Sequence, residues 1–164
     1  MASGDTLVVF TPLHNQPPAT NAATIDLRNQ HPVLDFDAAA DEDAIFGSVL
    51  PRNYAGGGLT ITLVWLASTA IVDNVVWNTA IERHQDDVDD LDADSFAAAS
   101  AVTATTASAS GEPAYDTITH TSGAQMDSLA VGESFRLKVT RDANNASDTM
   151  AGDAELLRVE IRET

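Results

Sequence analysis

The sequence predicts an all-β protein, an antiparallel two-sheet β-sandwich of the jelly-roll kind with an extended N-terminal arm. Two segments near the C-terminus, 134–141 and 154–162, alternate apolar and polar residues, which is the period of a strand with one buried face. Turn-forming residues divide the chain into roughly eight to ten such short segments. Because no long amphipathic helical pattern accompanies them, two packed sheets account best for the segments.

The N-terminal part of the chain has short, weakly patterned strands separated by proline. Pro17 and Pro18 impose an extended path, since proline fixes φ and lacks an amide proton. We divide the single domain into 1–36, the N-terminal arm with the first strands, and 37–164, the sandwich domain. The strands expected in the first part are 6–11, 22–27 and 32–36.

The strongest strand pattern lies in the middle of the chain, directly after the glycines at 56–58, which predict a tight turn. In 59–67 every second residue is apolar, and Trp65 falls on that apolar face. After a turn at 73–74 the segment 75–82 repeats the alternation with Trp77 in the apolar phase. We expect these two segments to form a β-hairpin or to be neighbours in one sheet.

The remaining segments are less regular. An apolar run covers 44–50, and 115–121 has a strand pattern. The Ala/Thr/Ser tract 95–110 is ambiguous between helix and strand, although its β-branched residues favour a strand.

Charge and composition exclude several classes of function. The chain has 25 acidic and 8 basic residues, a net charge of −17, which repels nucleic-acid phosphates and anionic membranes. It has no cysteine, so disulfides, zinc–thiolate sites and thiol catalysis are ruled out. The N-terminus lacks the pattern of a secretory signal, and the most apolar stretch, 59–76, is too polar to span a bilayer.

No motif of an enzyme or a cofactor site is present, and we expect neither catalysis nor a bound cofactor or metal. The four histidines, at 14, 31, 84 and 120, have no metal-ligand spacing. The aspartate run 86–94 has the carboxylates of a calcium loop, but counted from Asp90 the sixth and twelfth positions are Ser95 and Ala101, where an EF-hand has Gly and Glu. A solvated acidic loop is the favoured interpretation, with Ca²⁺ binding as the alternative.

Several segments together resemble small jelly-roll virion proteins of tailed phages. The similarity runs from Ile45 to Arg162 and rests on structural motifs, mostly turn glycines and core aromatics. These motifs are 51–54 followed by 56–58 and the Trp65 strand, 76–83, 131–137 with Arg141 and Asp148, and 152–156. The resemblance implies a non-enzymatic, oligomeric particle component, commonly a trimer, that serves in capsid decoration, head fibres or tail appendages.

Two functions therefore compete. The first is a capsid decoration (cement) protein, made in the host cytoplasm, that binds the major capsid protein or another virion protein and stabilises the shell as a homotrimer. The second is a carbohydrate- or receptor-binding module of a phage tail or fibre, for which Trp65, Trp77 and Tyr54 are the candidate stacking residues. The strand phase of the two tryptophans favours core positions instead.

Candidate interface residues come from two places. One is a cluster formed by half of the basic residues, on the solvent face of the two C-terminal strands. An acidic neighbour, or acids across the sheet, are its possible partners. The other is the proline-rich arm, which is expected to order on contact with a neighbouring subunit. The candidate residues are Arg136, Lys138, Arg158, Arg162, Pro17 and Pro18.

Overall fold

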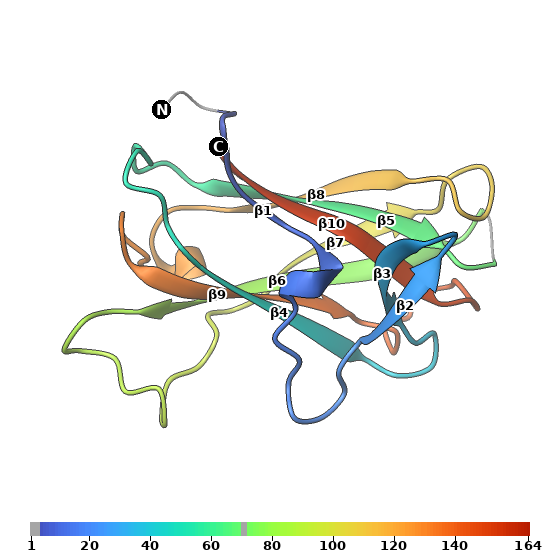
Figure 1. Ribbon diagram of the computed structural model, residues 1–164, viewed down its shortest axis with the longest axis horizontal. Helices are drawn as coiled ribbons and strands as arrows, with labels where there is room; N and C mark the ends of the chain where they lie inside the picture. Colours follow the sequence, from blue (N-terminus) through green and yellow to red (C-terminus); the bar gives the residue numbers. More distant parts are fainter. Residues whose placement is uncertain (1–3, 70–71) are drawn as a thin grey trace.

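Two antiparallel sheets packed face to face make up the protein (Figure 1). The computed structural model describes residues 4–69 and 72–164, and within them the only helices are two single 3-10 turns, η1 (Pro12–His14) and η2 (Ala124–Met126). Neither is long and apolar enough to cross a membrane. The predicted all-β sandwich is thereby confirmed.

The sheets have six and four strands. The larger has the order β2-β3-β10-β5-β8, and β1 also pairs with β10; the smaller has the order β4-β9-β6-β7. The larger sheet contains β1 (Thr6–Phe10), β2 (Thr24–Arg28), β3 (His31–Phe36), β5 (Leu59–Ala67), β8 (Ala114–His120) and β10 (Ala154–Glu163). The smaller contains β4 (Glu42–Val49), β6 (Asn74–His84), β7 (Ser100–Thr105) and β9 (Ser134–Arg141).

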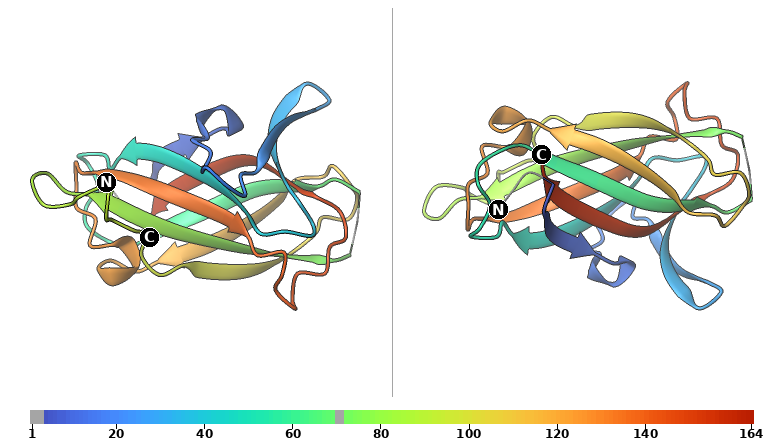
Figure 2. Two further views of the ribbon diagram at one scale, coloured as in Figure 1. Left: turned by 90° about the horizontal axis from the view of Figure 1, so that it is seen from below. Right: turned by 90° about the horizontal axis from the view of Figure 1, so that it is seen from above.

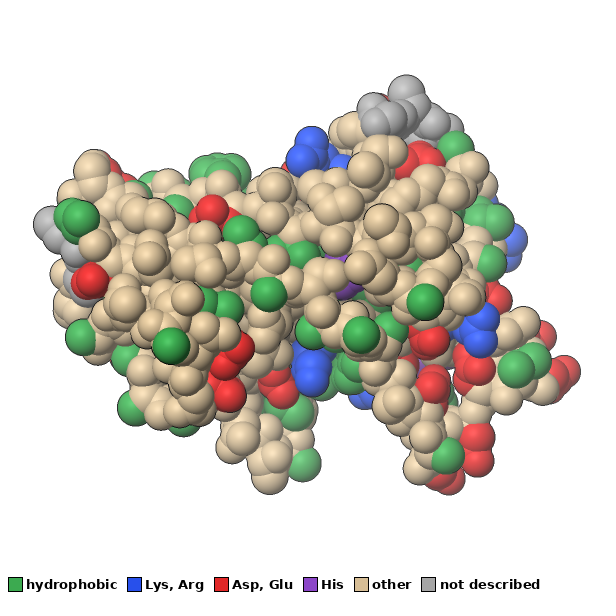
Figure 3. Space-filling view, turned by 180° about the vertical axis from the view of Figure 1, so that it is seen from behind, with side chains coloured by type: hydrophobic (Ala, Val, Ile, Leu, Met, Phe, Trp, Pro, Cys, Tyr) green, Lys and Arg blue, Asp and Glu red, His purple; other side chains and the backbone are tan. Residues whose placement is uncertain are grey.

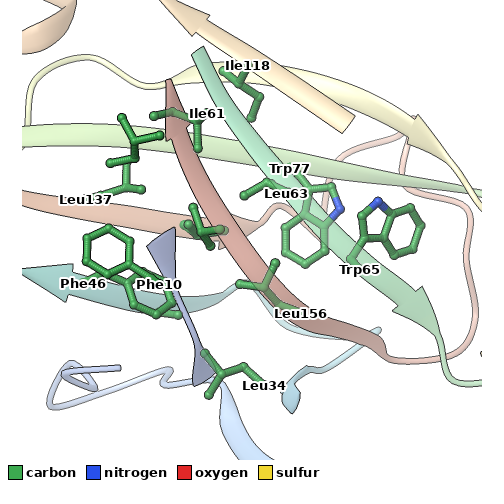
Figure 4. Packing of buried hydrophobic residues seen from close by; sticks show 14 of the residues in the cluster. Phe10, Leu34, Phe46, Ile61, Leu63, Trp65, Trp77, Ile118, Leu137 and Leu156 are labelled. Atoms are coloured by element: carbon green, nitrogen blue, oxygen red, sulfur yellow. The ribbon is translucent and has the colours of Figure 1, made fainter. Parts of the chain in front are cut away.

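The core between the sheets is built around aromatic side chains (Figure 4). Trp65 and Trp77 are fully buried and meet edge to face across the two layers, with ring centroids 5.9 Å apart. Phe10 stacks on Phe46 at 5.1 Å, which joins β1 of one sheet to β4 of the other. Such pairs add about 0.5–1.5 kcal/mol each to the burial of their area. The prediction that both tryptophans belong to the core is confirmed.

The predicted pairing of 59–67 with 75–82 is wrong. β5 lies in the six-stranded sheet and β6 in the four-stranded sheet, so they do not form a hairpin. Likewise β9 and β10 belong to different sheets. In both cases the connection crosses the sandwich, and the apolar faces of the two strands meet through the core instead of lying side by side. Alternation identifies which face of a strand is buried, but it does not identify the strand that pairs with it.

A β-bulge shifts the phase of β10. The register with β5 slips between Leu156 and Arg158, so Leu156 points into the core and Leu157 is partly exposed. The predicted inward series began with Leu157 and was therefore wrong at that residue, while Val159 and Ile161 are buried as expected.

Most of the predicted N-terminal arm is part of the sandwich. β1 pairs with β10, and β2 and β3 form a hairpin whose second strand also pairs with β10. Phe10, Leu34 and Phe36 are buried in the common core. Within the described residues 4–36, the longest stretch outside the sheets is 11–23, where Asn15 and Ala22 form single bridges to β4. The division at residue 36 therefore does not separate two structural parts.

A buried arginine ties the crossing from β9 to β10 into the core. The side chain of Arg141 is 0% exposed, and its partner Asp148 is 1% exposed. The guanidinium donates to both carboxylate oxygens of Asp148 at 2.8 and 3.1 Å, and to the carbonyls of Phe36, Met150 and Gly152 at 2.7–3.2 Å. Asp148 also accepts the amide of Val76 in β6 at 3.0 Å. One side chain thus holds both sheets and the crossover together.

Replacing Asp148 by Asn is expected to lower the free energy of unfolding by about 3 kcal/mol or more, because the Arg141 charge stays buried without its counter-ion. Chemical denaturation with urea, followed by tryptophan emission, measures the change. Asp92→Asn, at an exposed loop position, should stay within about 0.5 kcal/mol of the parent protein. Equal stabilities for the two variants would show that the buried pair does not hold the crossover.

Candidate functional site

The outer face of the four-stranded sheet presents three rows of side chains. The alternation in β9 that buries Phe135, Leu137 and Val139 turns Arg136, Lys138 and Thr140 outward. Pairing with β4 and β6 then places one outward residue of each neighbour beside each of these. The rows are Asp43–Thr140–Asn78, Ile45–Lys138–Ala80 and Gly47–Arg136–Glu82.

The charged residues of this face are paired with one another. Arg136 donates to both oxygens of Glu82 at 2.5 and 2.7 Å, and the Glu82 side chain is only 1% exposed. The Lys138 Nζ lies 4.0 Å from Asp43 Oδ2, and the Thr140 hydroxyl donates to the other oxygen of Asp43. The face is therefore polar but locally neutralised.

Phe96 covers the two cations from above. Its ring centroid lies 5.2 Å from Arg136 Cζ and 5.2 Å from Lys138 Nζ, within the range of cation–π attraction. The backbone of the next residue, Ala97, donates to the carbonyl of Ile81 at 2.8 Å, which fixes the ring beside β6. Phe96 is still partly exposed, so part of its apolar surface faces the space above the sheet.

Two projecting segments form the walls of this face, and both are visible as lobes in Figure 3, the acidic one at the lower right. The first is 85–99, which joins β6 to β7. Arg83 donates to Asp89 at 3.2 and 3.3 Å, and the amide of Gln85 donates to Asp89 at 2.6 Å. These hydrogen bonds, the one from Arg83 above all, lower the pKa of Asp89. The start of the acidic loop is therefore held in place against the end of β6.

The opposite wall is the end of segment 11–23, held against β4. Asn21 accepts the amide of Asp43 at 2.8 Å, and the amide of Ala23 donates to the Asp43 carbonyl at 3.0 Å. Asp41 stands beside it and accepts both the amide and the side-chain nitrogen of Asn144 at 3.0 and 2.9 Å. The wall is thus lined by amide and carboxylate groups.

Between the walls lies a hollow of about 430 Å³, which we call the sheet groove. Its size is within the range of small-ligand sites, roughly 300–1,000 Å³. The lining combines carboxylates, amides, an ammonium group, hydroxyls and one aromatic ring. These residues are Asn21, Asp41, Asp43, Asn78, Thr79, Ala80, Phe96, Ala97, Ala99, Lys138 and Thr140. Such a set offers several hydrogen-bond donors and acceptors beside a small apolar contact.

The predicted basic cluster is divided between the two faces of the molecule. Arg136 and Lys138 lie at the sheet groove, whereas Arg158 and Arg162 lie on the outer face of the six-stranded sheet. The grouping of all four was wrong because β9 and β10 are in different sheets. Pro17 and Pro18 lie in the segment 11–23 outside the sheets, and Pro17 is exposed. An interface role for these residues stays a prediction.

The proposed aromatic platform does not exist on the surface. Trp65 and Trp77 are 0% exposed, and the Trp65 indole donates to Asp116 at 2.8 Å. Tyr54 packs partly against the core and donates its hydroxyl to the carbonyl of Gly57. Any ligand that stacks on an aromatic ring of the groove must use Phe96. No local pattern marks Phe96 as a site residue, because it stands in an Ala/Ser-rich tract with no hydrophobic period.

The aspartate run 86–94 is part of the groove wall. Within 4–69 and 72–164 there is no group of three or more His, Cys, Asp or Glu residues placed to hold a metal ion. Asp89 is occupied by Arg83, and the Asp90 carbonyl accepts the amides of Ala93 and Asp94 at 2.9 and 2.8 Å.

A second polar hollow, of about 180 Å³, is entirely acidic in its charges. It lies where β2 and β3 meet the start of β4 and is lined by Thr24, Asp35, Asp37, Glu42 and Asp153. Burial and then the nearby charges of Asp153 and Glu155 raise the pKa of Asp35 from 3.8 to about 6. One oxygen of Asp35 is buried without a hydrogen-bond partner. At neutral pH the ionised form of Asp35 is therefore disfavoured by burial and by the neighbouring acids.

Comparison with known proteins gives a fold but no family. No family model matches the sequence, and no curated protein matches it significantly. Among solved structures, the chain resembles a family 35 carbohydrate binding module from an environmental isolate, with a TM-score of 0.56 at 10% identity, covering 94% of this chain and 92% of that one.

Two other carbohydrate-binding modules are similar to the same extent. The CBM35 of Abf62 from Cellvibrio japonicus has a TM-score of 0.54 at 12% identity, covering 94% of this chain and 92% of that one. The CBM22-2 xylan-binding domain of Xyn10C from Paenibacillus barcinonensis has a TM-score of 0.53 at 12% identity, with 92% of each chain covered. At these identities the likeness establishes the shared β-sandwich architecture.

Replacing Asp35 by Asn should stabilise the protein above pH 7 by about 1 to 2 kcal/mol, a value reduced for the partial exposure of this group. Its folded pKa exceeds the unfolded value, so folding takes up a proton between about pH 4 and 6. The free energy of unfolding of the parent therefore rises as the pH falls through that window, and Asn removes this rise. Urea titrations at pH 4 and pH 8 measure both effects.

Asp86→Asn, an exposed position in the acidic run, serves as the control and should keep the pH dependence of the parent. A parent and an Asp35→Asn variant with the same stability at pH 8 would contradict the assignment.

Proposed function

We propose that this chain is a non-catalytic binding module that holds a carbohydrate chain in the sheet groove. The observation that carries the proposal is the groove itself: a hollow of about 430 Å³ with a polar floor, two projecting walls and a partly exposed aromatic ring. Saccharides present many hydroxyl groups and apolar ring faces, and this lining offers partners for both. The similarity to carbohydrate-binding modules supports the same reading at the level of the fold.

The groove suits a neutral ligand better than a charged one. Arg136 is neutralised by Glu82, and Lys138 stands near Asp43, so the cations at the floor already have counter-ions. Asp41 and Asp43 would repel an anion, and the net charge of −17 adds to that repulsion. Asn78 and Thr140, side by side in one row, provide uncharged hydrogen-bonding groups at the centre. We therefore expect recognition of an uncharged polysaccharide through its hydroxyls.

Phe96→Ala is expected to weaken binding of a soluble neutral polysaccharide by about tenfold, equivalent to about 1.4 kcal/mol, because the ring contact is lost. Asn78→Ala should weaken it to a similar degree by removing hydrogen bonds from the floor. Isothermal titration calorimetry against xylan, galactan and mannan oligosaccharides measures the effect.

Arg158→Ala, on the outer face of the opposite sheet, is the matched control and should bind like the parent. Tryptophan emission should not shift on binding, because Trp65 and Trp77 are fully buried and lie outside the groove lining. Binding that survives Phe96→Ala and Asn78→Ala but fails in Arg158→Ala would place the site on the other sheet and refute the groove proposal.

The resemblance to phage virion proteins supports a second proposal, a capsid decoration protein that binds the shell as a trimer. Its structural support is the segment 11–23, which projects from the body and carries Pro17 and Pro18. It ranks below carbohydrate binding because the groove has a built lining, whereas the shell-binding role rests on sequence motifs. A tail or fibre location would instead agree with the first proposal, with the sheet groove as the receptor-binding part.

Mixing the purified chain with phage particles that lack decoration, then sedimenting them, tests the shell role. Saturable binding that is lost in a Pro17→Asp, Pro18→Asp double variant with unchanged stability supports it. Recovery of all the protein in the supernatant contradicts it.

A further inference from the structure

The β2 strand is one of the edge strands of the six-stranded sheet and lies in a hairpin that projects from the body (Figure 2). The turn consists of Asn29 and Gln30, both at positive φ, 46° and 68°. In a hairpin with a two-residue turn, Arg28 and Asp26 exchange hydrogen bonds with the partner strand β3. The peptide groups of Ile25 and Leu27 therefore point away from the sheet, toward solvent.

This edge also exposes apolar side chains that continue the core face. Ile25 pairs with Leu34 and Leu27 pairs with Pro32, so their side chains share the face on which Leu34 is buried. Yet Ile25 is 57% and Leu27 65% exposed, because the hairpin extends beyond the cover of the opposite sheet. An apolar edge strand of this kind is one that soluble proteins usually protect.

An apolar hollow of about 230 Å³ lies directly beside the exposed pair. It is formed by Ile25 and Leu34 of the hairpin together with Pro12, Leu13 and Pro17 from the segment 11–23, with Asn15 and Ala23 completing the lining. Leu13 is itself 70% exposed. A strand added at the β2 edge would direct every second side chain toward this hollow.

The negative charge of the β2 edge indicates which kind of partner could bind there. Asp26 is exposed between Ile25 and Leu27, and one of its oxygens accepts the Leu27 amide at 2.7 Å, covering an edge donor in the free protein. The only cation of the strand, Arg28, is bound to Glu155 at 2.5 Å. A second copy paired symmetrically about Asp26 would set two aspartates opposite each other between chains of net charge −17. A basic residue opposite Asp26 would instead attract its carboxylate and favour pairing of the two strands.

We propose that β2 is a docking edge for an extended segment of a different protein, in which apolar residues face Ile25 and Leu27 and a Lys or Arg faces Asp26. The segment extends the sheet by one antiparallel or parallel strand, with main-chain hydrogen bonds to the peptide groups of Ile25 and Leu27. Its basic side chain draws the Asp26 carboxylate away from the Leu27 amide, which frees that donor for the added strand. This role is separate from the sheet groove.

A synthetic peptide of about seven residues in which Val and Lys alternate is the probe. Titrated into the intact protein, it should bind saturably and shift the backbone amide signals of 24–28 in NMR spectra. A peptide with Glu in place of Lys should bind at least about tenfold more weakly. Leu27→Lys should abolish binding of the Val/Lys peptide, and Asp26→Lys should reverse the preference between the two peptides.

Val49→Lys is the matched control, since Val49, like Leu27, is an exposed aliphatic strand residue, 52% exposed, but lies at the end of β4. It should bind the Val/Lys peptide like the parent. The proposal is overturned if the peptide does not bind, if Leu27→Lys binds it as the parent does, or if the shifts fall on the groove residues. It is also overturned if the free protein dimerises in sedimentation experiments and Leu27→Lys makes it monomeric.

Discussion

The buried ion pair of Arg141 and Asp148 is the constraint on which the rest of the sandwich depends. The chain must leave β9 in one sheet and enter β10 in the other, and the crossover carries carbonyl groups into the interior. The Arg141 guanidinium satisfies those of Met150 and Gly152 and reaches Phe36 in β3 as well. Asp148 neutralises the charge and also receives the Val76 amide. Because a buried charge without partners costs several kcal/mol, the two sheets can meet in few other arrangements.

The same strand makes the groove. β9 alternates strictly, so the phase that sends Arg141 into the interior sends Lys138 and Thr140 to the outer face. The pairing of β9 with β4 and β6 then sets Asp43 and Asn78 beside them. The position of the groove floor is therefore a consequence of how the crossover is buried. A change that let β9 slip by one residue would expose the core face and bury the groove residues.

The distribution of charge explains why so acidic a chain has no free basic patch among its described residues. Six of the eight basic residues form ion pairs with acids: Arg28, Arg83, Arg136, Lys138, Arg141 and Arg162. Some of the acids in these pairs, such as Glu82 and Asp148, are nearly buried, and their partner cations offset the cost of removing the carboxylates from water. The paired cations thus stabilise the fold and neutralise nearby acids, which supports the proposal that the sheet groove binds an uncharged ligand.

Sequence reasoning identified the faces of strands but not their neighbours. The period of two correctly predicted that Phe135, Leu137 and both tryptophans are buried. It also places Arg141 in the same inward phase, which is a signal of a buried cation. It could not show that β5 and β6 separate into different sheets, because both topologies bury the same faces. The bulge at Leu157 and the position of Phe96 over the cations depend on tertiary contacts that leave no local pattern.

The sheet groove has two parts with different physical origins. Its floor is made by strands of the sandwich, and its walls are made by segments that connect strands. Its floor belongs to paired strands whose positions are determined by the core. Its walls belong to the segments 11–23 and 85–99, which lie outside the strands, where sequence changes are tolerated more readily than in the core. Phe96, Asn21 and Asp41 all stand on or beside these walls. Ligand choice is therefore expected to depend on the wall sequences as well as on the polar side chains of the floor.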